Sequence, residues 1–223
     1  MSVNSYSDYT FCNQSWTGRP QTHHWSPVFG AARSAVRWWD VVSPQTLSEA
    51  DRRIVAAWAA DCAERVLSLF EVNAPEDDRP RDAIARTRAF ARGELGAAEE
   101  IRQRFVAGRA AHDVTEPAAV AAARAAAQAS GVAHMGAHAL GAAAYAAKAA
   151  GLGTPEQPNA VDEEIRWQLE HMSAEARSAL ASLPSLGENS AGPLGSGLLA
   201  SGILGSIIRK IQAGVSESTP HPR

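Results

Sequence analysis

The sequence predicts an all-α fold, either a multi-helix bundle or a set of stacked antiparallel helical pairs. Apolar residues recur every three or four positions, alanine is abundant, and the alternation typical of strands is missing. Of the 223 residues, 45% are hydrophobic and 20% are charged, which is typical of a globular domain. Because alanine buries little area per residue, we expect the helices to pack at close range.

Start signals for helices recur along residues 46–185, which are predicted to form one helical domain. Ser48 followed by Asp51 has the spacing of a capping box. Asp78 before Pro80 is a second start signal, because proline is tolerated in a first turn that needs no amide donor. The expected helices cover about residues 48–72, 78–93, 97–111, 115–131 and 132–151, with two more beginning at 159 and 173.

The two ends of the chain differ from this domain. Residues 1–45 hold most of the aromatic residues without a sustained period, so they are predicted to form an arm whose rings pack on the helical body. A lid over a pocket or a contact with a partner are the alternatives for this arm, and residues 31–40 could form a short helix. Residues 216–223 are predicted to be a disordered tail.

Residues 186–215 are rich in Gly, Leu and Ile and are predicted to form a C-terminal helix. One apolar stripe runs through Leu194, Leu198, Leu204, Ile208 and Ile211. Glycine lowers helix propensity by about 1 kcal/mol per residue relative to alanine, so this helix needs external support. We expect it to pack on the domain; a groove of a partner or a membrane surface are the alternatives.

Charge and motifs exclude several classes of function. The formal net charge of -3 does not favour nucleic-acid binding. The sequence has no stretch of about 20 strongly apolar residues, so a membrane role is not expected. The beginning of the chain has no signal-peptide pattern, and Cys12 and Cys62 form no disulfide framework, so a cytoplasmic location is expected. No phosphate loop, nucleophile elbow or Cys-x-x-Cys pair is present, so no cofactor and no metal is predicted.

One expected helix carries a group of side chains suited to chemistry on a single face. The residues are His134, His138, Tyr145 and Lys148. As catalytic groups, the imidazoles would transfer protons while the phenol and the amine polarise a substrate oxygen. As a metal site, the two histidines would need a third ligand, such as His112 or Glu94. As structural residues, the same side chains would bond to neighbouring helices.

A second group of candidate residues is acidic and basic. The substrate-binding candidates are Asp78, Arg79, Arg81 and Glu94. Arg79 and Arg81 are expected to pair with Asp61 or Glu64 of the preceding helix; the alternative is a clamp for an anionic substrate. A further run interleaves arginines with glutamates and is typical of a solvated face: Glu99, Glu100, Arg102, Arg104 and Arg109.

Several runs in residues 50–170 resemble a family of bacterial putative immunity proteins, some of which carry exonuclease-like names. The runs begin at Trp58 (WAADCAERVL), Asp78 (DRPRDAI), Arg92 (RGE), Ala133 (AHMGAH), Ala144 (AYAAK) and Glu164 (EIRWQ). The resemblance implies an all-helical domain that neutralises a toxin by binding it. It does not extend to the aromatic arm or to the Gly/Leu/Ile-rich segment.

Two functions are therefore predicted as alternatives. In the first, the chain is an immunity-type protein that binds and neutralises a toxin-like partner protein. In the second, it is a small helical enzyme that acts by His, Tyr and Lys acid-base chemistry on an anionic or carbonyl-bearing metabolite. The sequence leaves a homo-oligomer open, and it does not identify the partner or the substrate.

Overall fold

A computed structural model of the chain describes residues 43–217, and these residues form helices and loops without any strand. The aromatic arm, apart from its last residues, the short helix expected at 31–40 and the end of the tail lie outside the described residues. The helices are α1 (Glu49–Glu64), α2 (Leu67–Glu71), α3 (Arg79–Ala91), α4 (Ala97–Gln103), α5 (Val106–Ala110), α6 (Pro117–Gly131), α7 (His138–Gly153), α8 (Ala160–Glu170), α9 (Ala174–Ala181), the 3₁₀ turn η2 (Leu198–Ala200) and α10 (Gly202–Glu217). The predicted all-α fold is confirmed.

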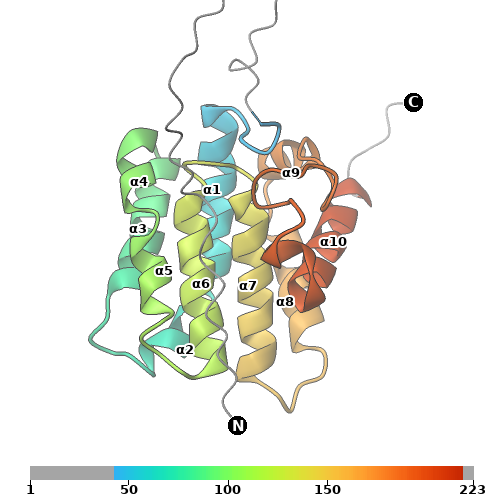
Figure 1. The fold of residues 1–223 in the computed structure, drawn as a ribbon. Helices are drawn as coiled ribbons and strands as arrows, with labels where there is room; N and C mark the ends of the chain where they lie inside the picture. Colours follow the sequence, from blue (N-terminus) through green and yellow to red (C-terminus); the bar gives the residue numbers. More distant parts are fainter. Residues whose placement is uncertain (1–42, 218–223) are drawn as a thin grey trace, which may run out of the picture. The chain divides into compact units, whose positions relative to one another are not determined.

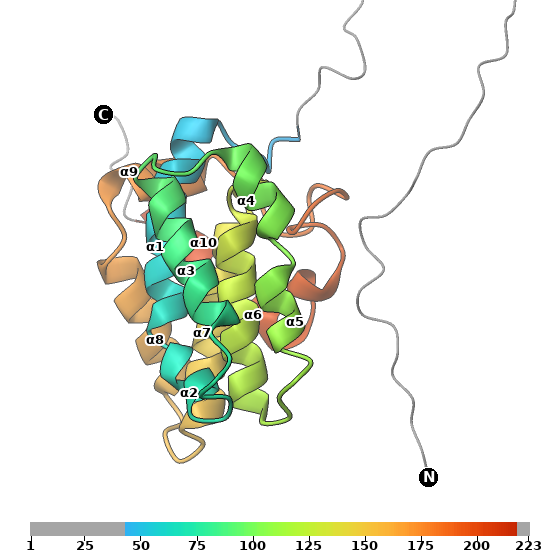
Figure 2. The same ribbon diagram turned by 90° about the vertical axis from the view of Figure 1, so that its left-hand side faces the viewer.

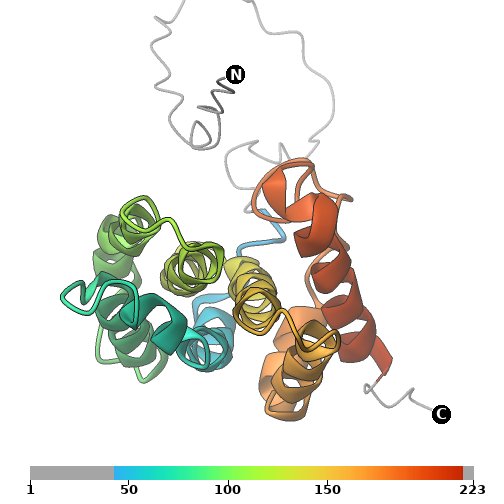
Figure 3. The same cartoon turned by 90° about the horizontal axis from the view of Figure 1, so that it is seen from below.

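The helices of the described part are arranged around a central group of three. Helices α1, α6 and α7 contact one another, with α3, α4 and α5 on one side and α8, α9 and α10 on the other (Figures 1 and 3). Helices α6 and α7 are antiparallel neighbours with the most extensive contact in the molecule. The central helices are thus covered on two sides by shorter ones.

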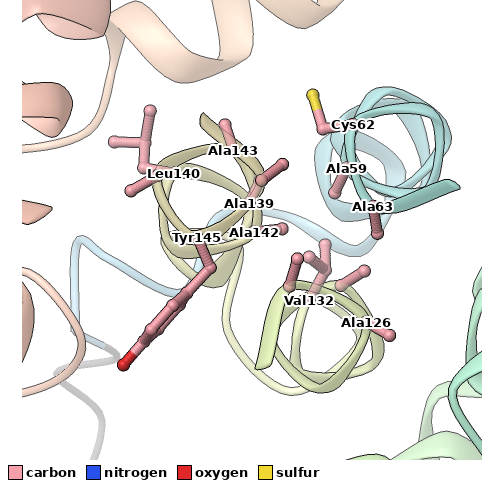
Figure 4. Close-up of a cluster of buried hydrophobic side chains, with 14 of the residues drawn as sticks. Ala59, Cys62, Ala63, Ala126, Val132, Ala139, Leu140, Ala142, Ala143 and Tyr145 are labelled. Carbon is pink, nitrogen blue, oxygen red and sulfur yellow. The ribbon is translucent and has the colours of Figure 1, made fainter. Parts of the chain in front are cut away.

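Alanine side chains fill the contacts between the central helices. Figure 4 shows Ala59 and Ala63 of α1 facing the alanines of α7, and Ala126 on the neighbouring α6. These alanines are fully buried, as is Ala142 of α7. The distance between packed helices depends on the side chains at the contact, so alanine lets the three backbones approach closely. This explains the alanine-rich composition.

Two of the start signals found in the sequence, Ser48 and Ser173, cap their helices with side-chain hydrogen bonds, whereas Asn159 holds the N-cap position of α8 without one. Ser48 Oγ accepts from the amide of Asp51 at 3.1 Å, and Ser173 caps α9 in the same way. The N-cap of α6 is Glu116, whose carboxylate accepts from the amide of Ala119. Asp78 holds the N-cap position of α3, but the capping bond comes from the residue before it. Asp77, the residue before the predicted cap, therefore makes the capping bond in place of Asp78.

Tertiary contacts break three of the expected helices. The first divides at residues 65–66 into α1 and α2, and the third divides at 104–105 into α4 and α5. The helix expected from 132 begins only at His138, because the amides of Gly136 and Ala137 donate to the backbone oxygens of Thr46 and Gln45. Residues 132–137 thus form a connection, not a first turn.

The C-terminal segment packs against the domain through α10. Leu204, Ile208 and Ile211 are buried, and α10 contacts α7, α8 and α9. The two earlier members of the predicted stripe lie before the helix: Leu194 is buried in a loop, while Leu198 is half exposed. The buried contacts of α10 offset the low helix propensity of its glycines.

The buried amide of Gln45 holds the loop that precedes α10. Its Oε1 accepts from the amide of Leu194 at 2.9 Å, and its Nε2 donates to the carbonyl of Ala191. Gly192 has a φ of +82°, and a Cβ there would lie 2.7 Å from the Gln45 amide oxygen. Glycine at 192 therefore allows both the turn and the close approach of Gln45.

Gly141 tests the closeness of α6 and α7. A Cβ at this position would lie 2.4 Å from Oε1 of Gln128 on α6. A Gly-to-Ala change inside a helix is normally favourable, but this clash should lower the free energy of unfolding by about 2 kcal/mol in Gly141→Ala. Gly108→Ala is the control, since its nearest neighbour is 3.8 Å away, and it should stabilise by about 0.5 kcal/mol. Chemical denaturation measures both, and equal effects would contradict close packing at Gly141.

Candidate functional site

The two candidate histidines lie at the start of α7. His134 is in the connection 132–137 and His138 is the first residue of the helix, with ring centroids 6.5 Å apart. Nδ1 of His138 bonds to Oε1 of Gln128 at 2.8 Å. Gly131 makes room for this pair, since a Cβ there would lie 2.9 Å from the His138 ring. The partner of His138 is thus an amide of α6, not a carboxylate.

Burial and neighbouring cations keep both imidazoles neutral. The packed atoms around His138 lower its pKa to about 4, mainly because burial disfavours the imidazolium, with further contributions from His134 and Arg104. The pKa of His134 is also lowered, first by burial and then by Arg104 and Arg52. The charged groups that act on this pair are all cationic. Neutral imidazoles can accept a proton, but no carboxylate orients them as in a catalytic triad.

Tyr145 and Lys148 lie on the same helix but farther along it. At a rise of about 1.5 Å per residue, they lie roughly 10 and 15 Å from His138 along the helix axis. Tyr145 is only 3% exposed, its ring centroid is 5.9 Å from the guanidinium of Arg124, and it lies away from Cys62 and Ala59 in Figure 4. The four side chains therefore do not meet around one point.

The acidic and basic candidates form separate ion pairs. Arg79 binds Asp77 at 2.5 Å and Asp113 at 2.6 Å, and its hydrogen bond lowers the pKa of Asp77. Arg81 binds Glu71 at 2.5 Å and lies 3.9 Å from Asp78. Glu94 receives two bonds of 2.7 Å from Arg92.

The pairing expected with Asp61 and Glu64 is made by a different arginine. Arg88 binds both carboxylates and lowers the pKa of Glu64 through its hydrogen bond. The reason is that α3 runs antiparallel to α1, as the bond from Arg53 near the start of α1 to the carbonyl of Phe90 shows. The beginning of α3 therefore lies beside α2, and its later turns lie beside α1. The ion pairs predicted for Asp61 and Glu64 are therefore present, but Arg88 makes them in place of Arg79 and Arg81.

The histidines and the arginine candidates lie near opposite ends of α1, whereas Glu94 lies near the start of this helix, where Arg53 donates to the carbonyl of Leu95. The connection that carries His134 bonds to residues 45 and 46, just before this helix, whereas Arg81 binds Glu71, beyond its end. Helix α1 has 16 residues and is therefore about 24 Å long. The arginines thus cannot clamp a substrate that the histidines act on.

A groove that the sequence analysis did not predict lies between α2, the end of α7 and α8. Its volume is about 520 Å³, and its lining includes Leu69, Gly153 and Trp167. The guanidinium of Arg65 lies 3.8 Å from the ring centroid of Trp167, which also stacks on His171 at 4.1 Å. None of the eight candidate residues lines this groove.

A buried polar network supports the groove wall. Glu164 is 5% exposed and accepts from Arg65 Nε at 2.9 and 3.1 Å and from Gln168 Nε2 at 3.1 Å. The Gln168 side chain also donates to the carbonyl of Ala143, while the backbone carbonyl of Gln168 accepts from Nε1 of Trp58. The network joins α1, α7 and α8. The i, i+3, i+4 spacing of Glu164, Trp167 and Gln168 could have revealed it, but Arg65 comes from the unexpected break after α1.

Burial next to this network suppresses the reactivity of the one described cysteine. Cys62 is fully buried, and burial, with the carboxylates of Glu164 and Asp61 adding, raises the pKa of its thiol. A thiol that stays protonated is a poor nucleophile. Cys62 therefore serves as a small apolar residue of the core.

Within residues 43–217, neither a metal-binding cluster nor a membrane-spanning helix is found. No group of three or more His, Cys, Asp or Glu side chains within residues 43–217 is arranged to hold a metal ion. In the same range, no helix has both the length and the apolar character that crossing a bilayer requires.

The fold and these networks define an all-helical domain with an alanine core and polar groups at its periphery. Residues 45–175 match the model of the family described as Imm-5 like putative immunity protein, and the chain belongs to this family. No curated protein and no solved structure matches the chain. The resemblance of the sequence to a family of putative immunity proteins is thereby confirmed.

The environment of His138 predicts a pH-dependent contribution to stability. The unfolded chain takes up a proton near pH 6.5, but folded His138 does so only near pH 4, so acidification through this window favours unfolding. This group should remove about 3 kcal/mol of unfolding free energy from pH 7 to pH 4. His138→Gln should flatten that part of the profile, whereas His171→Gln, an exposed control, should keep it. Denaturation at a series of pH values measures this, and identical profiles would refute it.

The buried carboxylate of α8 predicts a second stability effect. Glu164→Ala leaves Arg65 without its carboxylate and Gln168 with one acceptor fewer, so it should lower the free energy of unfolding by about 2 kcal/mol. Asp162→Ala on the same helix removes an exposed pair with Lys210 and should cost about 0.5 kcal/mol or less. Thermal and chemical melts of both variants test this, and a larger effect at Asp162 would contradict it.

Proposed function

We propose that this protein is an immunity-type protein that binds a toxin-like partner protein and blocks its action. The observation that carries this proposal is membership of the immunity-protein family over residues 45–175, most of the helical domain. Neutralisation by binding needs a stable, complementary surface, and it does not need catalytic groups that converge on one point.

The arrangement of the candidate residues favours binding over catalysis. His138 bonds to an amide of α6, and Arg79 and Arg81 are engaged in ion pairs near the other end of α1. An enzyme acting through these groups would need them within hydrogen-bond reach of one substrate. Their separation is better explained by structural roles.

The packing of the domain also suits a binding protein. The central helices contact one another through fully buried alanines, and capped helices and ion pairs hold the periphery. A body that is already ordered loses little conformational freedom when it binds, so more of the interaction energy appears as affinity. We expect the partner to meet a largely pre-formed surface.

Co-expression with a toxin tests the proposal. A producing cell must hold the antidote before the toxin acts, so the first candidates are toxins encoded beside this protein. We expect growth to be rescued when this chain is produced with its cognate toxin, and the two purified proteins to elute together in size-exclusion chromatography.

Two variants separate binding from catalysis in the same assay. Tyr145→Phe keeps the ring and removes the hydroxyl, and Lys148→Ala removes the amine, so both should protect as well as the unchanged chain if neutralisation depends on binding alone. Loss of protection by either folded variant would support the alternative of an enzyme. Failure of the chain to protect against any neighbouring toxin would overturn the proposal.

A further inference from the structure

Helices α4 and α5 carry arginines that no carboxylate neutralises. Within residues 43–217, Arg102, Arg104 and Arg109 form no ion pair, and Arg102 and Arg109 are exposed. Arg104 makes its one polar side-chain bond to the carbonyl of Ile101. We call this surface, together with Phe105, the α4–α5 face.

The two carboxylates of α4 bind an arginine of α3 and not the arginines of their own segment. Glu100 is 2% exposed and binds Nη2 of Arg86 on α3 at 2.6 Å, and Glu99 binds the same nitrogen at 3.3 Å. The interleaved glutamates and arginines of this segment are typical of a solvated face in the sequence. In the structure both carboxylates share Arg86, so Arg102, Arg104 and Arg109 carry their positive charge without an ion pair within residues 43–217.

An aromatic ring lies within this positive surface. Phe105 is 56% exposed, and the guanidinium of Arg104 lies 4.2 Å from its ring centroid. A large apolar side chain with this exposure gains free energy when a partner covers it. Aromatic and arginine side chains are the residues most often found as energetic anchors of protein interfaces.

The positive charge continues toward the start of α1. Arg104 and Arg52 both act on His134, and no carboxylate is among the charged groups that shift this histidine. Nη1 of Arg52 donates to the carbonyl of Leu47, and Nε of the same side chain is buried without a partner among the described residues. The α4–α5 face is thus bordered by further cationic groups.

Exposed carboxylates without an ion pair occur on several helices of the described part, among them Asp82 of α3 and two residues of α8. Glu163 and Glu170 of α8 are exposed and form no ion pair within residues 43–217. Figures 1 and 2 both place α4 and α5 on the side of the central helices opposite to α8. The exposed arginines of α4 and α5 thus form a local basic surface on a chain whose formal net charge is -3.

We propose that the α4–α5 face is the surface that binds the partner protein, and that the partner contributes an acidic patch with an apolar residue that covers Phe105. This inference rests on the proposed function. Arginine pairs with carboxylates through two parallel hydrogen bonds, which gives such a contact orientation as well as attraction. A protein patch fits better than nucleic acid, because a long polyanion would also meet the net negative charge of the rest of the chain.

A labelled acidic peptide of alternating glutamate and leucine is the probe for this surface. Its affinity for the full chain is measured by fluorescence anisotropy at low and at physiological salt. Arg102→Ala and Arg109→Ala should each weaken binding about threefold, and the double variant about tenfold, because each exposed contact contributes roughly 0.7 kcal/mol. Arg166→Ala is the matched control: it removes an equally exposed arginine from α8 and should leave the affinity unchanged.

Several outcomes would overturn the proposal that the α4–α5 face is a binding surface. An equal loss in Arg166→Ala, or no binding of the peptide, would show that the α4–α5 face is not a specific acidic-peptide site. A single-stranded oligonucleotide of the same net charge should bind more weakly than the peptide; tighter binding would overturn the proposal in favour of nucleic acid. Phe105→Ser should weaken binding of the peptide about fivefold. An unchanged affinity would show that Phe105 takes no part in the contact.

The co-expression assay separates this inference from the proposed function. If the unchanged chain protects and the Arg102→Ala/Arg109→Ala double variant does not, both stand. If the folded double variant protects fully, the proposed function stands and the α4–α5 face is wrong. If the unchanged chain fails to protect, the proposed function falls, and a peptide that still depends on these arginines would identify a basic binding face with another role.

Discussion

The structure depends on the contact of α1, α6 and α7 through alanine. Side chains this small let the backbones approach closely, and an added methyl group at Gly141 would meet the side-chain amide of Gln128 on the opposing helix. The same closeness fixes the His138–Gln128 bond, which occupies space that Gly131 provides.

The outer helices are attached to this centre by polar networks as well as by apolar contacts. Glu164 and Gln168 bring α8 to α1 and α7, and Arg88 joins α3 to α1 through Asp61 and Glu64. Removing a charge from water costs free energy, and such pairs are stabilising only when their remaining polar atoms are also bonded. The buried carboxylate of Glu164 has more hydrogen-bond partners than the exposed carboxylate of Asp162 on the same helix.

These networks also decide which charges remain available to a partner. Arg86 takes both glutamates of α4, and so the arginines that follow them in the sequence are left without carboxylates. On α8, by contrast, exposed glutamates remain while Glu164 is used internally. The distribution of charge over the surface is therefore a consequence of how the helices pack, and it supports recognition of an acidic partner at α4 and α5.

The sequence by itself determined the fold class, the existence of most helices and the family. These depend on local features: the period of the apolar residues, the capping side chains at Ser48 and Ser173, and the runs shared with immunity proteins. Only the tertiary structure decided where α7 begins and which arginine meets Asp61, because both depend on which segments become neighbours. It also separated the histidines from Arg79 and Arg81, since a helical period shows which residues share a face but not which faces meet.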